Sequence, residues 1–189
     1  MSDSSEAAPE GARLRVTFEA FCTTHERAWR GFARTQVGTE QDAAVVVGAM
    51  KEHLSRNWAL ALRQEIPAAY AWRLLKEHLA AWLATAGHTR PALVQTAAFD
   101  AAIRYFQDQA RISLESLPEQ IGLFTAILDL PERQHDVVVL KYCMDMDDSK
   151  IAEYLGTPLA TLRSNLRHAR RRLARTLGRP ELADMRGER

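Results

Sequence analysis

The hydrophobic positions of this chain recur mostly at spacings of three and four residues. The clearest example is the segment 162–177, where five apolar side chains keep this spacing and therefore share one side of a helix. Large side chains follow the same period within 18–32 and again within 72–82. The two runs of β-branched residues, at 45–47 and 137–139, each lie inside a longer segment with a helical pattern. We therefore predict an all-α protein.

Breaks between these segments divide the chain into helices and domains. Thr39 is placed to cap a helix over about 40–58, and Pro67 interrupts the chain before a helix over about 69–85. The clearest break is the stretch 86–91, which combines Gly, His, Thr and Pro. The predicted organisation is a disordered tail at 1–12, a helical domain at 13–87, a partly helical linker at 88–117, a four-helix domain at 118–178 and a tail at 179–189.

The segment 148–177 has the pattern of a helix-turn-helix. The pair Asp147–Asp148 can cap the amides that open a first helix. Gly156 stands where that helix would end in a left-handed residue. Thr157 followed by Pro158 has the order of an N-cap and a proline at the first helical position. We therefore expect a second helix that starts almost at once, in the arrangement that places one helix in the DNA major groove.

The polar side of this second helix is cationic. No Asp or Glu occurs between Glu153 and Glu181, so its arginines have no acidic partner close in sequence. A charge run of this kind often marks only a solvated helix face. The two-helix pattern before it, however, favours nucleic-acid binding. The positions expected away from the leucine stripe are Ser164, Arg167, His168, Arg171 and Arg175, with Arg163, Arg170 and Arg172 on the flanks.

The charge of the whole chain hides this local asymmetry. Its 25 Lys and Arg residues nearly balance its 24 Asp and Glu residues, which gives a formal net charge of +1. A near-neutral protein with one basic end suggests a molecule that touches DNA with one module and another partner with the remainder.

The sequence does not indicate an active site. Cys22 and Cys143 are far apart and form no CxxC pair, so we interpret them as buried free thiols. The six histidines are scattered and form no HExxH motif or Cys/His cluster. An enzyme with a DNA-binding tail has only the segment 91–114 to support it. We therefore expect no enzymatic activity, no cofactor and no metal site.

The sequence also does not indicate a membrane protein. Residues 1–12 are acidic and rich in small side chains, unlike the basic and apolar start of a secretory signal. Crossing a membrane takes roughly 18 or more consecutive apolar residues, and the sequence contains no such run. We expect a cytoplasmic protein.

Four short motifs occur in order along the C-terminal part of the chain. They are Leu130–Gln134, Ile151–Glu153, Leu155–Gly156 and Arg170–Leu173. In this order and spacing they closely resemble region 4 of extracytoplasmic-function (ECF) sigma factors of the sigma-70 family. The resemblance covers Leu130–Gly178 nearly continuously.

The N-terminal half is more faintly similar to region 2 of the same family. The aromatic residues of 18–32 fit its first helix, 42–58 its second and 69–84 its third. Two details depart from the family. Val47–Gly48 stands where such factors usually carry an acidic pair, and Leu79–Trp82 stands where polar and basic residues are usual.

The resemblance implies a sigma factor that binds core RNA polymerase and promoter DNA, and whose helix-turn-helix docks on the upstream promoter element. Region 2 of the family holds the polymerase clamp and captures melted promoter DNA. Family members are often held inactive by an anti-sigma factor, so such a partner is implied as well. The polymerase-binding residues expected are Met50, Lys51, Leu54 and Trp58. The DNA-binding residues expected are Thr161, Arg163, Ser164, Arg167, His168, Arg170, Arg171 and Arg175.

One alternative from another class stays open at this point. A sigma-like regulator could use the same helix-turn-helix to bind DNA, or a partner, without initiating transcription. The departures in the region 2-like half motivate this alternative.

Overall fold

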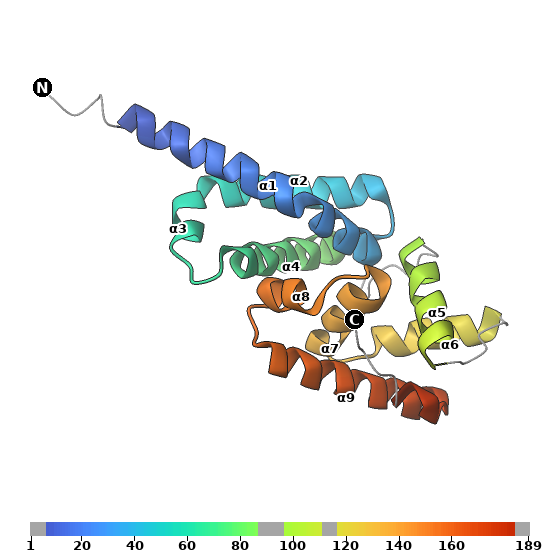
Figure 1. Cartoon of the computed structure of the whole chain (residues 1–189). Coiled ribbons are helices and arrows are strands. Elements are labelled where there is room, and N and C mark those ends of the chain that lie inside the picture. The colour runs from blue at the N-terminus through green and yellow to red at the C-terminus, as the bar shows by residue number, and fades with distance from the viewer. Residues whose placement is uncertain (1–6, 87–96, 111–116, 184–189) are drawn as a thin grey trace, which may run out of the picture. The chain divides into compact units, whose positions relative to one another are not determined.

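The computed structural model describes residues 7–86, 97–110 and 117–183 (Figure 1). Within these ranges the chain forms helices, turns and bends and contains no strand, which confirms the all-α prediction. None of the described helices is long and apolar enough to span a bilayer. The chain divides into two compact units, unit 1 at 1–87 and unit 2 at 88–189.

The described part of unit 1, residues 7–86, forms four helices packed around an aromatic and aliphatic core. They are α1 (Ala7–Val37), α2 (Glu40–Arg56), α3 (Trp58–Leu62) and α4 (Pro67–Thr85). Trp29 and Phe32 of α1, Met50 and Leu54 of α2 and Leu75 of α4 are all fully buried. The helical period that predicted these elements therefore also selects the core, because residues three and four apart share the buried face.

Three helix starts in unit 1 can be compared with their predictions. The start of α2 agrees with its prediction, and the starts of α1 and α4 differ. Thr39 caps α2 as predicted, because its hydroxyl accepts a hydrogen bond of 3.0 Å from the amide of Asp42. Helix α1, however, begins at Ala7, inside the segment 1–12 expected as a disordered tail. Pro67 opens α4 instead of preceding it, since proline is compatible with the first turn of a helix.

Unit 2 contains the remaining elements. They are α5 (Ala97–Ala110), α6 (Leu117–Leu128), α7 (Glu132–Val138), the π-helical turn η1 (Val139–Cys143), α8 (Asp148–Leu155), α9 (Leu159–Leu177) and the 3₁₀ turn η2 (Pro180–Ala183). The π-helical step is visible where the amide of Met144 donates to the carbonyl of Val139, five residues earlier, at 3.1 Å.

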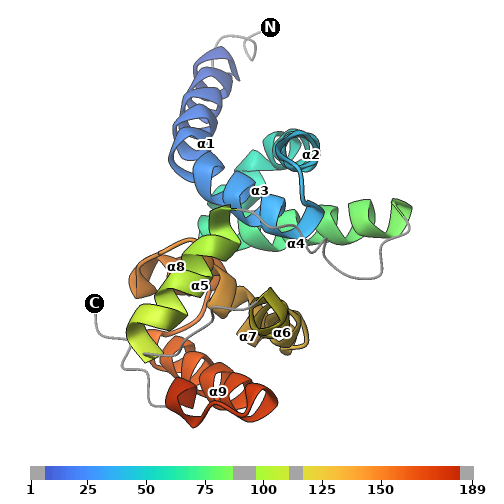
Figure 2. The same cartoon turned by 90° about the vertical axis from the view of Figure 1, so that its right-hand side faces the viewer.

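Helix α5 is part of unit 2, although its sequence segment was expected to be a linker. It packs against η1 and η2 (Figure 2). Ala102, Ile103 and Phe106 are buried, and the ring of Phe106 lies 5.1 Å from that of Tyr142 in an edge-to-face contact. The apolar face of α5 therefore packs into the hydrophobic core of unit 2.

The segment after α9 is also more ordered than the predicted tail at 179–189. Gly178 ends α9 in a left-handed conformation with φ of 63°, and η2 follows. Leu182 of η2 is fully buried, and Arg179 forms an ion pair of 2.9 Å with Glu119 of α6. Residues 184–189 lie outside the described ranges.

Candidate nucleic-acid interface

Helices α8 and α9 form the two helices of the helix-turn-helix, joined by a tight turn. Gly156 ends α8 with φ of 58° and ψ of 41°, so the left-handed conformation predicted for it is confirmed. The amide of Thr157 donates to the carbonyl of Ala152 at 3.0 Å, which closes the last turn of α8. A side chain with a Cβ would be strained at Gly156, because L residues rarely adopt this conformation.

The predicted caps of the two helices are wrong in detail. Pro158, not Thr157, is the N-cap residue of α9, and it has an extended ψ of 147°. Its carbonyl accepts the first helical hydrogen bond, from Leu162 at 3.0 Å, so α9 begins one residue later than expected. Asp147 occupies the N-cap position of α8 but makes no capping hydrogen bond through its side chain.

The leucine stripe of α9 lies on its buried face, as predicted. Leu162, Leu166, Ala169 and Leu173 are buried, whereas Leu177 at the end of the helix is only half-buried. This face packs against α6, α7 and α8. Because the stripe fixes how the helix is rotated, it also decides which side chains of α9 reach solvent.

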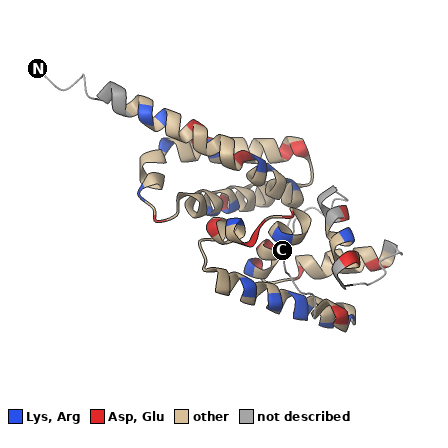
Figure 3. Cartoon of the chain, viewed as in Figure 1, with Lys and Arg blue, Asp and Glu red and all other residues tan. Residues whose placement is uncertain are grey.

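Most of the predicted DNA-binding side chains lie on the solvent side of α9, and Figure 3 shows the basic residues that recur along this helix. Ser164 is half-buried. Since α9 contains no acidic residue, its solvent side is positively charged from Arg163 to Arg175. The exposed members are Thr161, Arg163, Arg167, His168, Arg171 and Arg175.

Arg170 differs from the other arginines that were predicted to bind DNA. Its side chain is half-buried and hydrogen-bonds the phenol of Tyr142 on η1. Burial raises the pKa of Tyr142 well above its ordinary value, and the contact with Arg170 lowers it only in part. Tyr142 therefore stays protonated, and its hydrogen bond with Arg170 joins α9 to η1.

Asp148 connects three elements through two cations. Its carboxylate lies 2.9 Å from the ammonium of Lys141 on η1 and 3.7 Å from the guanidinium of Arg163 on α9. The side chains of Lys141 and Asp148 are only 10% and 17% exposed, whereas that of Arg163 is 70% exposed. The main partner of Asp148 is therefore the buried Lys141. The second oxygen of its carboxylate lies near the guanidinium of the exposed Arg163.

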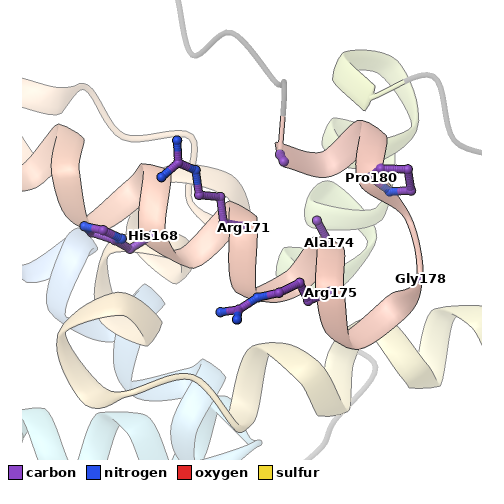
Figure 4. Close-up of a pocket in the computed structure, with 7 residues that line it drawn as sticks. His168, Arg171, Ala174, Arg175, Gly178 and Pro180 are labelled. Carbon is purple, nitrogen blue, oxygen red and sulfur yellow. The ribbon is translucent and has the colours of Figure 1, made fainter.

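A pocket of about 800 Å³ lies along the C-terminal part of α9 (Figure 4). Three of its lining residues, His168, Arg171 and Arg175, are polar side chains of α9, and η2 contributes Pro180 and Ala183. We did not predict from the sequence that η2 would line a pocket. The residues Gly178, Pro180 and Leu182 could have indicated a turn after α9 followed by an apolar side chain that packs back on unit 2. The lining residues are His168, Arg171, Ala174, Arg175, Gly178, Pro180 and Ala183.

The predicted polymerase-binding residues of unit 1 mostly lie in its core. Met50, Leu54 and Trp58 are buried, and the ring nitrogen of Trp58 donates to Thr17 at 2.9 Å. Lys51 is half-buried and forms an ion pair of 2.6 Å with Glu26. The physical reason is that Met50 and Leu54 follow the helical period and occupy the face of α2 that packs on α1 and α4, while Trp58 opens α3 and is buried there.

The described parts of the chain contain no group of three or more His, Cys, Asp or Glu residues that could hold a metal ion. Burial raises the pKa of the Cys22 thiol and raises that of Cys143 to about 12, so neither is a thiolate at neutral pH.

Comparison with known proteins supports the interpretation of unit 2. Residues 122–173 match the family model of sigma-70, region 4, over a segment that includes all of α7, η1 and α8 and most of α9. No curated protein matches the chain.

Proposed function

We propose, on the premise that residues 122–173 belong to the sigma-70 region 4 family, that this chain is a sigma factor of the ECF type. It would bind core RNA polymerase and direct it to promoters, with α9 docked in the major groove of the upstream promoter element. The observation that carries this proposal is the exposed face of α9, which is basic from Arg163 to Arg175 and backed by a buried leucine stripe. A sigma factor needs no bond chemistry of its own.

The positions along α9 suggest different roles for its side chains. Arg167 lies in the middle of the exposed face, where a guanidinium can make two hydrogen bonds to a guanine. Arg171 and Arg175 lie one and two turns further on and line the pocket beside η2. We assign Arg167 to reading base sequence and Arg171 and Arg175 to holding phosphates, with Thr161 and Ser164 near the start of the helix as further contacts.

The outer face of α2 is exposed, unlike most of the residues first predicted to bind polymerase. Val45 is 59% exposed, and Gly48 and Ala49 next to it are exposed too. A Cβ added at Gly48 would meet no atom within 4 Å, so this face of α2 is open. We propose that this face docks on core polymerase, or on an anti-sigma factor that competes with it.

The two assigned roles on α9 predict different responses to mutation. Arg171→Ala should weaken binding to all DNA sequences and flatten the slope of log affinity against log salt by about 0.9 for each phosphate that the variant no longer neutralises. Arg167→Ala should instead reduce the preference for the cognate site by about 1–3 kcal/mol. Fluorescence anisotropy with cognate and scrambled duplexes over a salt series measures both effects.

A matched control is Arg104→Ala, which removes the same charge from an exposed position on α5. It should leave the preference for the cognate site unchanged. If Arg171→Ala leaves the salt slope unchanged, Arg171 does not contact a phosphate.

In vitro transcription with core polymerase tests the proposed function as a whole. The purified chain should direct core polymerase to specific start sites in a genomic promoter library, and core polymerase alone should not use these sites. If no template yields a transcript, the chain is not a sigma factor.

A sigma-like regulator that binds DNA without initiating transcription is the second candidate. It is favoured by Val47, which is buried, and Gly48, which is exposed, at positions where similar factors carry an acidic pair. A pulldown with core polymerase separates the two candidates, because only the sigma factor requires that contact. Val45→Glu should abolish the pulldown if the outer face of α2 docks on polymerase, whereas Arg167→Ala should leave it intact.

A further inference from the structure

Two histidines that are 25 positions apart in the sequence meet in unit 1. His53 lies near the end of α2 and His78 in the second half of α4. Their rings are 5.4 Å apart between centroids, and Nδ1 of His53 lies 3.2 Å from Nε2 of His78. Two ring nitrogens thus point toward one another from two different helices.

This distance suits the coordination of a single metal ion. Zinc binds imidazole nitrogen at about 2.0–2.1 Å, so two nitrogens at a tetrahedral angle are separated by about 3.3 Å. The observed separation of 3.2 Å is therefore close to that of two neighbouring ligands. The same distance also fits a hydrogen bond between two neutral rings, which a metal ion would replace.

Both rings are accessible to an ion in solution. His53 is exposed and His78 is half-buried. Glu52, the carboxylate next to His53 on α2, already pairs with Arg56.

We propose that His53 and His78 form a binding site for one borderline transition-metal ion, of which Zn²⁺ is the example, and that water completes its coordination. Imidazole suits zinc, copper and nickel better than magnesium or calcium. Such an ion would join α2 to α4 and would stabilise unit 1, because it binds the folded pair and not two distant histidines of an unfolded chain. The site is independent of the DNA-binding function of unit 2.

The test is a titration of the full, tag-free and metal-stripped chain with Zn²⁺. Isothermal titration calorimetry should find one ion per chain, and added zinc should raise the midpoint of thermal unfolding followed by tryptophan fluorescence. All four tryptophans lie at positions 29–82, so this signal reports on unit 1. Long-range ¹H–¹⁵N spectra of the imidazoles should show the ring nitrogens of both histidines shifting together.

Single substitutions identify the ligands. Loss of an outer-shell partner commonly weakens metal binding by about 10–100-fold, so loss of a ligand should cost at least as much. His53→Gln and His78→Gln should each have this effect, and the double variant should bind no more weakly than the worse single variant. His168→Gln is the control, because it removes an exposed histidine from unit 2.

Two results would overturn the proposal. One is a wild-type chain that binds no Zn²⁺ at all, which would leave the pair as a hydrogen bond only. The other is binding that is unchanged in both His53→Gln and His78→Gln, which would place the ion elsewhere. Neither result bears on DNA binding or transcription.

Discussion

Phe106→Ala is expected to lower the free energy of unfolding of unit 2 by about 3–5 kcal/mol, the usual cost of deleting a buried aromatic side chain. Phe106 is fully buried and packs edge-to-face on Tyr142 of η1. Loss of the Phe106 ring would leave a cavity between α5 and η1. Because Tyr142 of η1 is hydrogen-bonded to Arg170, this cavity should also loosen α9. Hydrogen exchange measured by mass spectrometry should show faster exchange in η1 and α9.

The distribution of tryptophans provides an internal control for this experiment. Unit 2 contains no tryptophan, so the fluorescence transition of unit 1 should be unchanged by Phe106→Ala. Arg104→Ala removes an exposed side chain from the same helix and should cost little. Equal effects of the two substitutions would mean that α5 is a linker, as the sequence first suggested, and not part of the core.

Asp148→Asn should also destabilise unit 2, by about 3–5 kcal/mol, because it leaves the buried ammonium of Lys141 without a counter-charge. The two groups are 2.9 Å apart, and their side chains are only 10% and 17% exposed. The measurement is urea unfolding followed by far-ultraviolet circular dichroism, with tryptophan fluorescence used to separate the transition of unit 1.

Helix α8 contains a matched control for this ion pair. Lys150 and Glu153 are 2.8 Å apart, but their side chains are 36% and 41% exposed, far more than those of Lys141 and Asp148, so Lys150→Ala should cost less than about 1 kcal/mol. Adding Lys141→Met to Asp148→Asn should recover much of the lost stability, because it removes the uncompensated charge. Failure of this rescue would contradict the electrostatic explanation.

The sequence predicted best those features that depend on neighbours in the chain. The buried stripe of α9 follows from helical period alone, and Gly156 is left-handed because it ends a helix just before a second one begins. Caps were harder. Thr157 has the right chemistry for an N-cap, but the extended backbone of Pro158 takes that position, and a shift of one residue lies within the usual variation of helix ends.

Predictions that depended on what a face packs against were less successful. Met50, Leu54 and Trp58 were predicted to contact polymerase from a resemblance, but their helical spacing places them in the core of unit 1. Helix α5 has an apolar face that the sequence shows, yet the sequence does not say which unit covers it. The exposed residue Val45 could have been found by asking which positions of α2 lie opposite its buried stripe.

By itself the sequence determined that the chain is helical, that a helix-turn-helix lies near its end and that the outer face of α9 is basic. Only the tertiary structure decided that Arg170 turns inward to Tyr142 and that Asp148 joins Lys141 to Arg163. The same holds for the meeting of His53 and His78, which no spacing rule would pair. The physical reason is that helical period fixes which residues share a face, whereas contacts between helices depend on how those faces pack.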